Sequence, residues 1–146
     1  MNPEQAKIVR QSHVRLLARR AELSATFRVN LLRIDPSLRS LVVTADGQHD
    51  FQPVMWLEAV VSLLRTPWLL HRSLVELGRR LDGEVTARQV NNIGRACVQS
   101  LRSCLGEHWT AETEQAWGAF QTLLQSVVQS ALAARETQDD IEALAA

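Results

Sequence analysis

Residues 86–106 read TARQVNNIGRACVQSLRSCLG, and this stretch determines the fold class. Thr86 followed three residues later by Gln89 is a capping box, in which two side chains satisfy backbone N–H groups at a helix start. Apolar residues then recur every three or four positions up to Leu105, which is the period of an amphipathic α-helix. Gly106 ends the pattern, because glycine readily adopts the backbone conformation that closes a helix. The stretch therefore predicts one long helix with one face in a core.

The rest of the chain shows the same helical period, with no β-alternation and no internal repeat. Asp35-Pro36 and Thr66-Pro67 each end a helix, because the residue before proline disfavours helical geometry. Thr110 is the predicted N-cap of the last helix. Helices are predicted over approximately residues 3–20, 23–34, 53–65, 67–81, 87–105 and 111–131. A short helical turn is expected after Pro36 and a polar loop over residues 44–50. The last two helices are the longest, and their short connection predicts antiparallel packing.

Length and composition indicate one soluble domain. A chain of 146 residues with 46% hydrophobic and 22% charged residues can bury a single core. We expect this domain to span residues 1–135. The acidic, alanine-rich residues 136–146 are expected to form a partly disordered tail.

Several classes of function are excluded by the composition. Sixteen basic and sixteen acidic residues cancel, so no basic excess favours nucleic acid. No apolar run reaches the length of a membrane span, and no signal peptide is evident, so we expect a cytoplasmic protein. No nucleophile–base pair, phosphate loop or metal-ligand spacing appears, so no enzyme is predicted. Cys97 and Cys104 lie about 10.5 Å apart along one helix, too far for a disulfide, and are predicted to be buried thiols.

A set of short motifs in order resembles the globin family, and is most similar to bacterial single-domain haemoglobins and the globin part of flavohaemoglobins. The motifs are Asn2-Pro3-Glu4-Gln5, Asp35-Pro36-Ser37-Leu38-Arg39, Gln52-Pro53, Leu77-Gly78-Arg79-Arg80, Leu105-Gly106 and Ala116-Trp117-Gly118. The resemblance covers about residues 2–135. It implies an all-α globin fold, a three-over-three helical sandwich without a well-formed D helix.

The resemblance also assigns five positions around the haem pocket. The proximal histidine position falls on Leu81, and the phenylalanine that wedges the haem falls on Val42. The distal position falls on Gln52, which matches the bacterial globins, and the apolar position one turn later falls on Trp56. The pocket position of the second helix, often tyrosine in bacterial members, falls on Arg28. Most of the pocket therefore departs from the family pattern.

These departures predict a globin fold without haem. Leucine has no lone pair to bond iron, and no histidine lies between His71 and His108. The indole of Trp56 would occupy space that haem needs. We therefore predict no cofactor. The alternative is a haem globin with unusual axial ligation that binds oxygen or nitric oxide. Its ligand would have to come from His13, His49, His71, His108 or Cys97, for each of which a surface or core position is the better interpretation.

Arg28 has two interpretations. A guanidinium facing an apolar cavity is costly unless it is paired, so either it extends to solvent or an anion meets it. If a cavity persists, Arg28 and Gln52 would orient the carboxylate of a small amphipathic ligand such as a fatty acid, with Trp56 and Leu81 as apolar lining.

The resulting functional expectation is a regulatory or sensory module that binds a protein partner or a small apolar acid. It rests on analogy with other globin folds that have lost haem ligation, the non-haem domains of bacterial stressosome sensors and the phycobiliproteins. By the same analogy we expect a homodimer through the last two helices or a signalling protein as partner. The rival is a structural module with a solid core and no ligand.

Overall fold

The computed structural model describes residues 1–39, 53–81 and 85–145. Its α-helices are α1 (Pro3–Leu16), α2 (Arg20–Ile34), α4 (Pro53–Ser62), α5 (Pro67–Leu81), α6 (Ala87–Leu105) and α7 (Ala111–Ala145). Short 3-10 turns cover Leu17–Arg19, Pro36–Leu38, Leu63–Arg65 and Gly106–His108. The described ranges contain no strand, so the all-α prediction is confirmed. The expected absence of a D helix concerns residues that lie outside these ranges.

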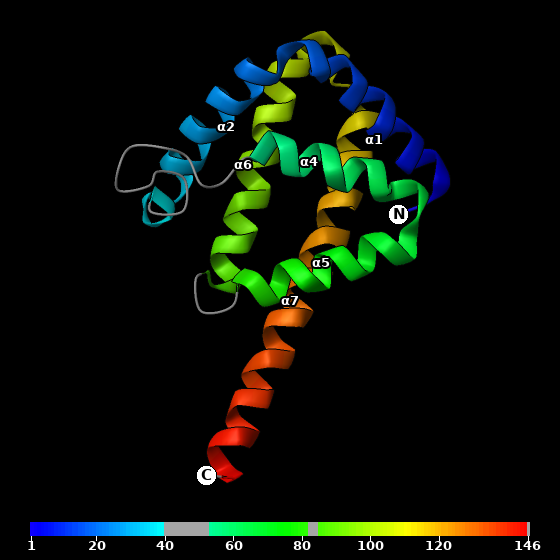
Figure 1. Cartoon of the computed structure of the whole chain (residues 1–146). Helices are drawn as coiled ribbons and strands as arrows, with labels where there is room; N and C mark the ends of the chain where they lie inside the picture. Colours follow the sequence, from blue (N-terminus) through cyan, green and yellow to red (C-terminus); the bar gives the residue numbers. More distant parts are fainter. Residues whose placement is uncertain (40–52, 82–84, 146) are drawn as a thin grey trace.

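The six helices form two layers of three. The first layer holds α1, α4 and α5, and the second holds α2, α6 and α7 (Figure 1). Within the layers α1 contacts α4, α2 runs along α6, and α6 runs along α7 in the opposite direction. Between the layers α1 and α5 pack on α7, and α4 packs on α2. This is the three-over-three arrangement that the resemblance to globins implies.

Local sequence signals set several helix ends. The predicted capping box forms at Thr86, and the structure shows a second one at Asn2; each satisfies backbone N–H groups in the first turn. Thr110 accepts a hydrogen bond from the backbone N–H of Thr113 at 3.2 Å. Gly106 closes α6 with φ of 52°, in the left-handed region that glycine adopts without a steric cost. Except for the C-terminal end of α7, the helices could therefore be placed from the sequence to within a few residues.

The core fills the space between the two layers. Its largest fully buried side chains are Val9, Leu16, Leu31, Leu38, Leu74, Leu101, Trp117 and Phe120. The indole N–H of Trp117 donates to Ser12 Oγ at 2.8 Å, which satisfies a polar group that the core encloses. The rings of Trp117 and Phe120 pack edge to face, with 5.7 Å between the ring centroids.

Buried polar side chains join α2 to α6. Asn30 Nδ2 donates to Ser100 Oγ at 3.0 Å, and Arg33 Nη2 donates to Asn30 Oδ1 at 2.9 Å. Just after α2, Asp35 accepts from Asn92 Nδ2 at 2.9 Å and from Ser37. These hydrogen bonds, first that of Ser37 and then that of Asn92, hold the pKa of Asp35 below its ordinary value. The α2–α6 pair is thus fixed by specific polar contacts as well as by apolar packing.

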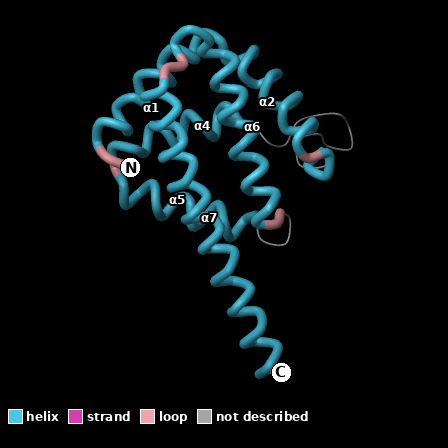
Figure 2. Tube along the Cα trace, turned by 180° about the vertical axis from the view of Figure 1, so that it is seen from behind, coloured by secondary structure: helices cyan, strands magenta, loops and turns pink. Residues whose placement is uncertain are grey.

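The C-terminal end differs from expectation. Residues 136–145, expected to be partly disordered, continue α7 as helix and project beyond the two layers, which Figure 2 shows from behind. Alanine, glutamate, glutamine and leucine favour helix, and no glycine or proline follows Gly118 to interrupt it. Among the described helices, none is both long enough and apolar enough to span a bilayer.

Gly78 allows α5 to pack closely on α7. A Cβ atom added at Gly78 would lie 2.6 Å from Ala131 Cβ and 3.2 Å from the backbone oxygen of Val128. Neither atom can move without moving α7 itself. At Gly118, by contrast, an added Cβ meets nothing within 4 Å.

We predict that substitution by alanine affects the free energy of unfolding differently at the two glycines. Gly78→Ala should lower the free energy of unfolding by about 1 kcal/mol or more, because overpacking outweighs the gain in helix propensity. Gly118→Ala should leave it unchanged or raise it by up to about 1 kcal/mol. Urea unfolding of both variants measures the difference. Equal stability of the two variants would contradict the close α5–α7 contact.

Candidate functional site

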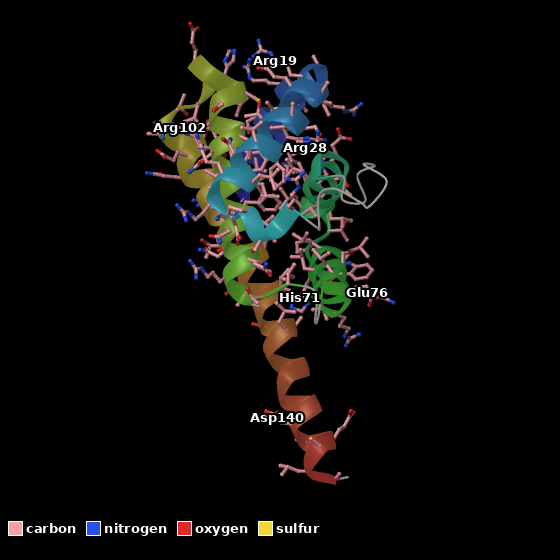
Figure 3. The ribbon with its side chains drawn as sticks, turned by 90° about the vertical axis from the view of Figure 1, so that its left-hand side faces the viewer. Arg19, Arg28, His71, Glu76, Arg102 and Asp140 are labelled. Carbon is pink, nitrogen blue, oxygen red and sulfur yellow. The ribbon has the colours of Figure 1, made fainter. Side chains whose placement is uncertain are left out.

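Arg28 is the one sequence-predicted pocket residue whose side chain the structure describes. It follows the buried Phe27 on α2 and precedes the buried Leu31 by three residues, so the core-facing side of α2 lies beside it. The side chain is half-buried, and Figure 3 labels it between α2 and α4. Its Nε atom is enclosed and has no hydrogen-bond partner among the residues that the structure describes. Part of Arg28 thus reaches solvent, as a snorkelling side chain would, while one donor is buried without a partner in this part of the chain.

The other four predicted positions are less fully placed. Val42 and Gln52 lie outside the described residues. Trp56 lies in the first turns of α4 and Leu81 is the last residue of α5, but their side chains also lie outside the description. Their backbone positions put Trp56 on the helix that packs against α2, and Leu81 three residues after the α5–α7 contact at Gly78.

Three of the four histidines are described, and they lie in three different parts of the molecule. His71 is exposed on α5, and His108 is exposed in the turn between α6 and α7, where its Nε2 lies 3.5 Å from Arg15 Nη1. His13 is buried on α1, close enough to Glu58 of α4 and to Arg20 for their charges to act on it. His49 lies outside the described residues. No two of the described histidines belong to a common site.

The two cysteines are free, as predicted. Cys104 is buried, and Cys97 packs against the core from α6. Burial raises the pKa of the Cys97 thiol to about 12. At neutral pH this cysteine is a thiol, and only a thiolate would ligate iron strongly. Cys97 therefore has the core role that the sequence indicated.

The described side chains hold no cluster of three metal-binding residues. None of the described histidines or cysteines occupies the position that the resemblance assigns to the axial ligand of haem, which is Leu81.

The structure contains an open cleft that the sequence analysis did not predict. An open cleft of about 680 Å³ lies between α1 and the turn that joins α6 to α7. Gln11, Arg15, Glu107, His108 and Glu112 contribute its polar lining. The contact between Arg15 and His108 joins residues 93 positions apart. No local sequence pattern predicts the contact between Arg15 and His108, because it forms only where α1 packs across the start of α7.

Known proteins resemble this chain in structure but not detectably in sequence. No protein-family profile and no curated protein matches the sequence. Among solved structures, the closed form of the globin domain of HGbRL is 23% identical in sequence, with a TM-score of 0.44. The alignment covers 92% of this chain and 99% of that domain. A likeness of this size implies nothing about ligand or function.

The environment of His13 makes a prediction about pH. Burial lowers the pKa of His13 below its ordinary value, and the charge of Glu58 offsets this only in part. The unfolded chain therefore takes up a proton near the ordinary pKa of about 6.5, whereas the folded chain resists it until a lower pH. Stability contributed by neutral His13 is fully present above pH of about 6.5 and is lost as the pH falls through the folded-state pKa.

Unfolding by urea at a series of pH values between about 7.5 and 5 measures this loss. His13→Gln should make the free energy of unfolding less dependent on pH in this window. His71→Gln, which removes an exposed histidine, is the matched control. An unchanged slope in His13→Gln would show that His13 is not kept neutral by the fold.

Proposed function

We propose that this protein is a haem-free module of globin fold that binds a small apolar acid and serves a regulatory or sensory role. The observation that carries the proposal is the enclosed Nε of Arg28, for which the described ranges of the chain supply no hydrogen-bond partner. An unsatisfied buried donor costs about 1–3 kcal/mol, and a buried cation more. A carboxylate bound beside Arg28 would remove that cost.

The surroundings of Arg28 favour an acid with an apolar body. Phe27 and Leu31 are buried next to it on α2, and α4 packs onto α2 with Leu57 and Val60 in the core. A ligand that reaches Arg28 therefore meets apolar side chains on both helices. In ligand sites generally, apolar contact holds the ligand and a few polar groups orient it. Arg28 would be such a group, and Gln52 is the second candidate.

Support for a haem-free protein comes from the donor set. Leucine occupies position 81 at the end of α5, where the resemblance to globins places the iron ligand. The described histidines are exposed or lie on α1, and Cys97 is held as a thiol. Haem in this chain would therefore need a ligand outside the family pattern. Binding of oxygen or nitric oxide through such a haem is the competing function.

Titration with a fatty acid tests the role of Arg28. We expect wild-type protein to bind dodecanoic acid and Arg28→Met to bind it about tenfold more weakly or worse, because a charge-assisted hydrogen bond is lost. Arg28→Lys should recover part of the affinity. Arg72→Met, which removes an exposed arginine from α5, is the control and should bind as wild type does. Isothermal titration calorimetry measures the dissociation constant of dodecanoic acid for each variant. Absence of binding, or equal affinity in Arg28→Met, would refute the acid-binding proposal.

Addition of hemin tests the haem-free assignment separately. We expect the absorption spectrum to show only free or loosely bound hemin, with no shift to a stoichiometric ligated species, because no axial ligand is in place. A ligated spectrum at one haem per chain would instead support the competing function, which is binding of oxygen or nitric oxide through haem. Its loss in His49→Ala or His71→Ala would then identify the ligand.

A further inference from the structure

Helix α5 carries an exposed tryptophan on a basic side. Trp68 is 67% exposed, although tryptophan is among the side chains that gain most from burial. Arg72 and Arg79 follow it on the same helix and are exposed as well. Arg65 precedes it by three residues, in the turn before α5, and is also exposed. We call Arg65, Trp68, Arg72 and Arg79 the α5 face.

The α5 face points away from the core. Leu70, Leu74 and Gly78 lie on the buried side of the helix. At about 100° per residue, the three residues of the α5 face that belong to the helix lie within about 40° of one another, on the opposite side. Figure 3 labels Glu76 on that outward side of α5, at the edge of the molecule.

The α5 face keeps a positive charge. Glu76 is the one acidic residue in the sequence of α5, so it cannot neutralise three arginines, and it is itself engaged in an interaction within the chain. On the neighbouring helix α4, Glu58 is the one acidic residue, and it forms an ion pair with Arg20. The acidic residues of these two helices therefore leave at least two of the three arginines without a counter-charge.

The layer to which α5 belongs is basic as a whole. Residues 1–19 and 53–81, which form α1, α4, α5 and the turns that follow α1 and α4, carry eight basic and three acidic side chains. The remaining residues carry eight basic and thirteen acidic side chains. The formal net charge of zero therefore conceals a molecule with one basic layer. Such an asymmetry turns the basic side of a protein toward a negatively charged surface.

We propose that the α5 face binds the surface of a membrane that contains anionic lipids. In this contact the arginines lie among the charged headgroups, and the indole of Trp68 enters the boundary between the headgroups and the hydrocarbon. Binding is reversible and weakens with salt, because three cations and one aromatic side chain hold the protein at the surface without inserting a helix. The proposal goes beyond the acid site at Arg28, because it assigns a partner to the outside of the protein.

The composition of the α5 face favours a lipid surface over an acidic protein or a nucleic acid. Arg72 and Arg79 are about 10.5 Å apart along the helix. A protein partner would need carboxylates at a matching interval, whereas anionic lipids diffuse in the plane of the membrane and can gather under each arginine. A nucleic acid duplex supplies phosphates but no apolar layer for Trp68. Tryptophan suits the headgroup boundary, because its ring is apolar and its N–H is a hydrogen-bond donor.

Co-sedimentation with lipid vesicles tests the proposal. We expect the protein to bind vesicles of phosphatidylcholine in which about one lipid in three is phosphatidylserine, and to be released by salt. It should not bind vesicles of phosphatidylcholine alone. Arg72→Gln/Arg79→Gln should bind about tenfold more weakly or worse, because both arginines act at the surface.

The matched control removes the same charge from the other layer. Arg95→Gln/Arg102→Gln replaces two exposed arginines of α6 at the same seven-residue spacing, and should bind the vesicles as wild type does. Arg28→Met should also bind them normally, which separates this contact from the acid site. An equal loss in the α5 and α6 variants would show attraction by net charge alone and would overturn the proposal. So would binding of an acidic helical peptide or a DNA duplex with no binding to the vesicles.

Fluorescence locates Trp68 in the contact. The chain contains four tryptophans, so the signal of Trp68 is the difference between wild type and Trp68→Phe. We expect anionic vesicles to shift this emission to shorter wavelength, and brominated acyl chains to quench it, because the indole leaves water for the headgroup boundary. If the protein binds the vesicles while this difference signal stays unchanged, the contact lies elsewhere and the α5 face is refuted.

Discussion

The burial of Trp117 is the contact on which the rest of the structure depends. Its indole is 2% exposed near the start of α7, and its N–H reaches Ser12 on α1. Because α1, α5 and α6 all pack on α7, this side chain anchors the helix that contacts three others. A residue of this size contributes several kcal/mol through apolar burial, provided that its one polar group is satisfied. Ser12 fulfils that condition.

The close approach of α5 to α7 connects this core to the candidate site. Gly78 and Ala131 let the two helices meet almost backbone to backbone, three residues before Leu81. This contact holds the end of α5, where Leu81 lies, against α7.

The enclosed Nε of Arg28 is the polar feature of the candidate site that core packing does not explain. Arg28 lies where α4 packs on α2, and this donor has no hydrogen-bond partner among the residues that the structure describes. Such a donor suits a small anion in an apolar setting.

The sequence by itself determined the helices and most of their ends, because the capping box at Thr86, Asp35-Pro36, Thr66-Pro67 and Gly106 act within a few residues of the chain. It also identified Arg28 as a charged residue at an apolar pocket position, and it predicted that both cysteines are free. Only the tertiary structure placed His13 near Glu58, enclosed the Nε of Arg28 and joined Arg15 to His108. It also extended α7 through residues 136–145, where composition alone had suggested partial disorder. The physical reason is range: a cap is satisfied by neighbours in sequence, whereas burial and charge pairing depend on which helices meet in space.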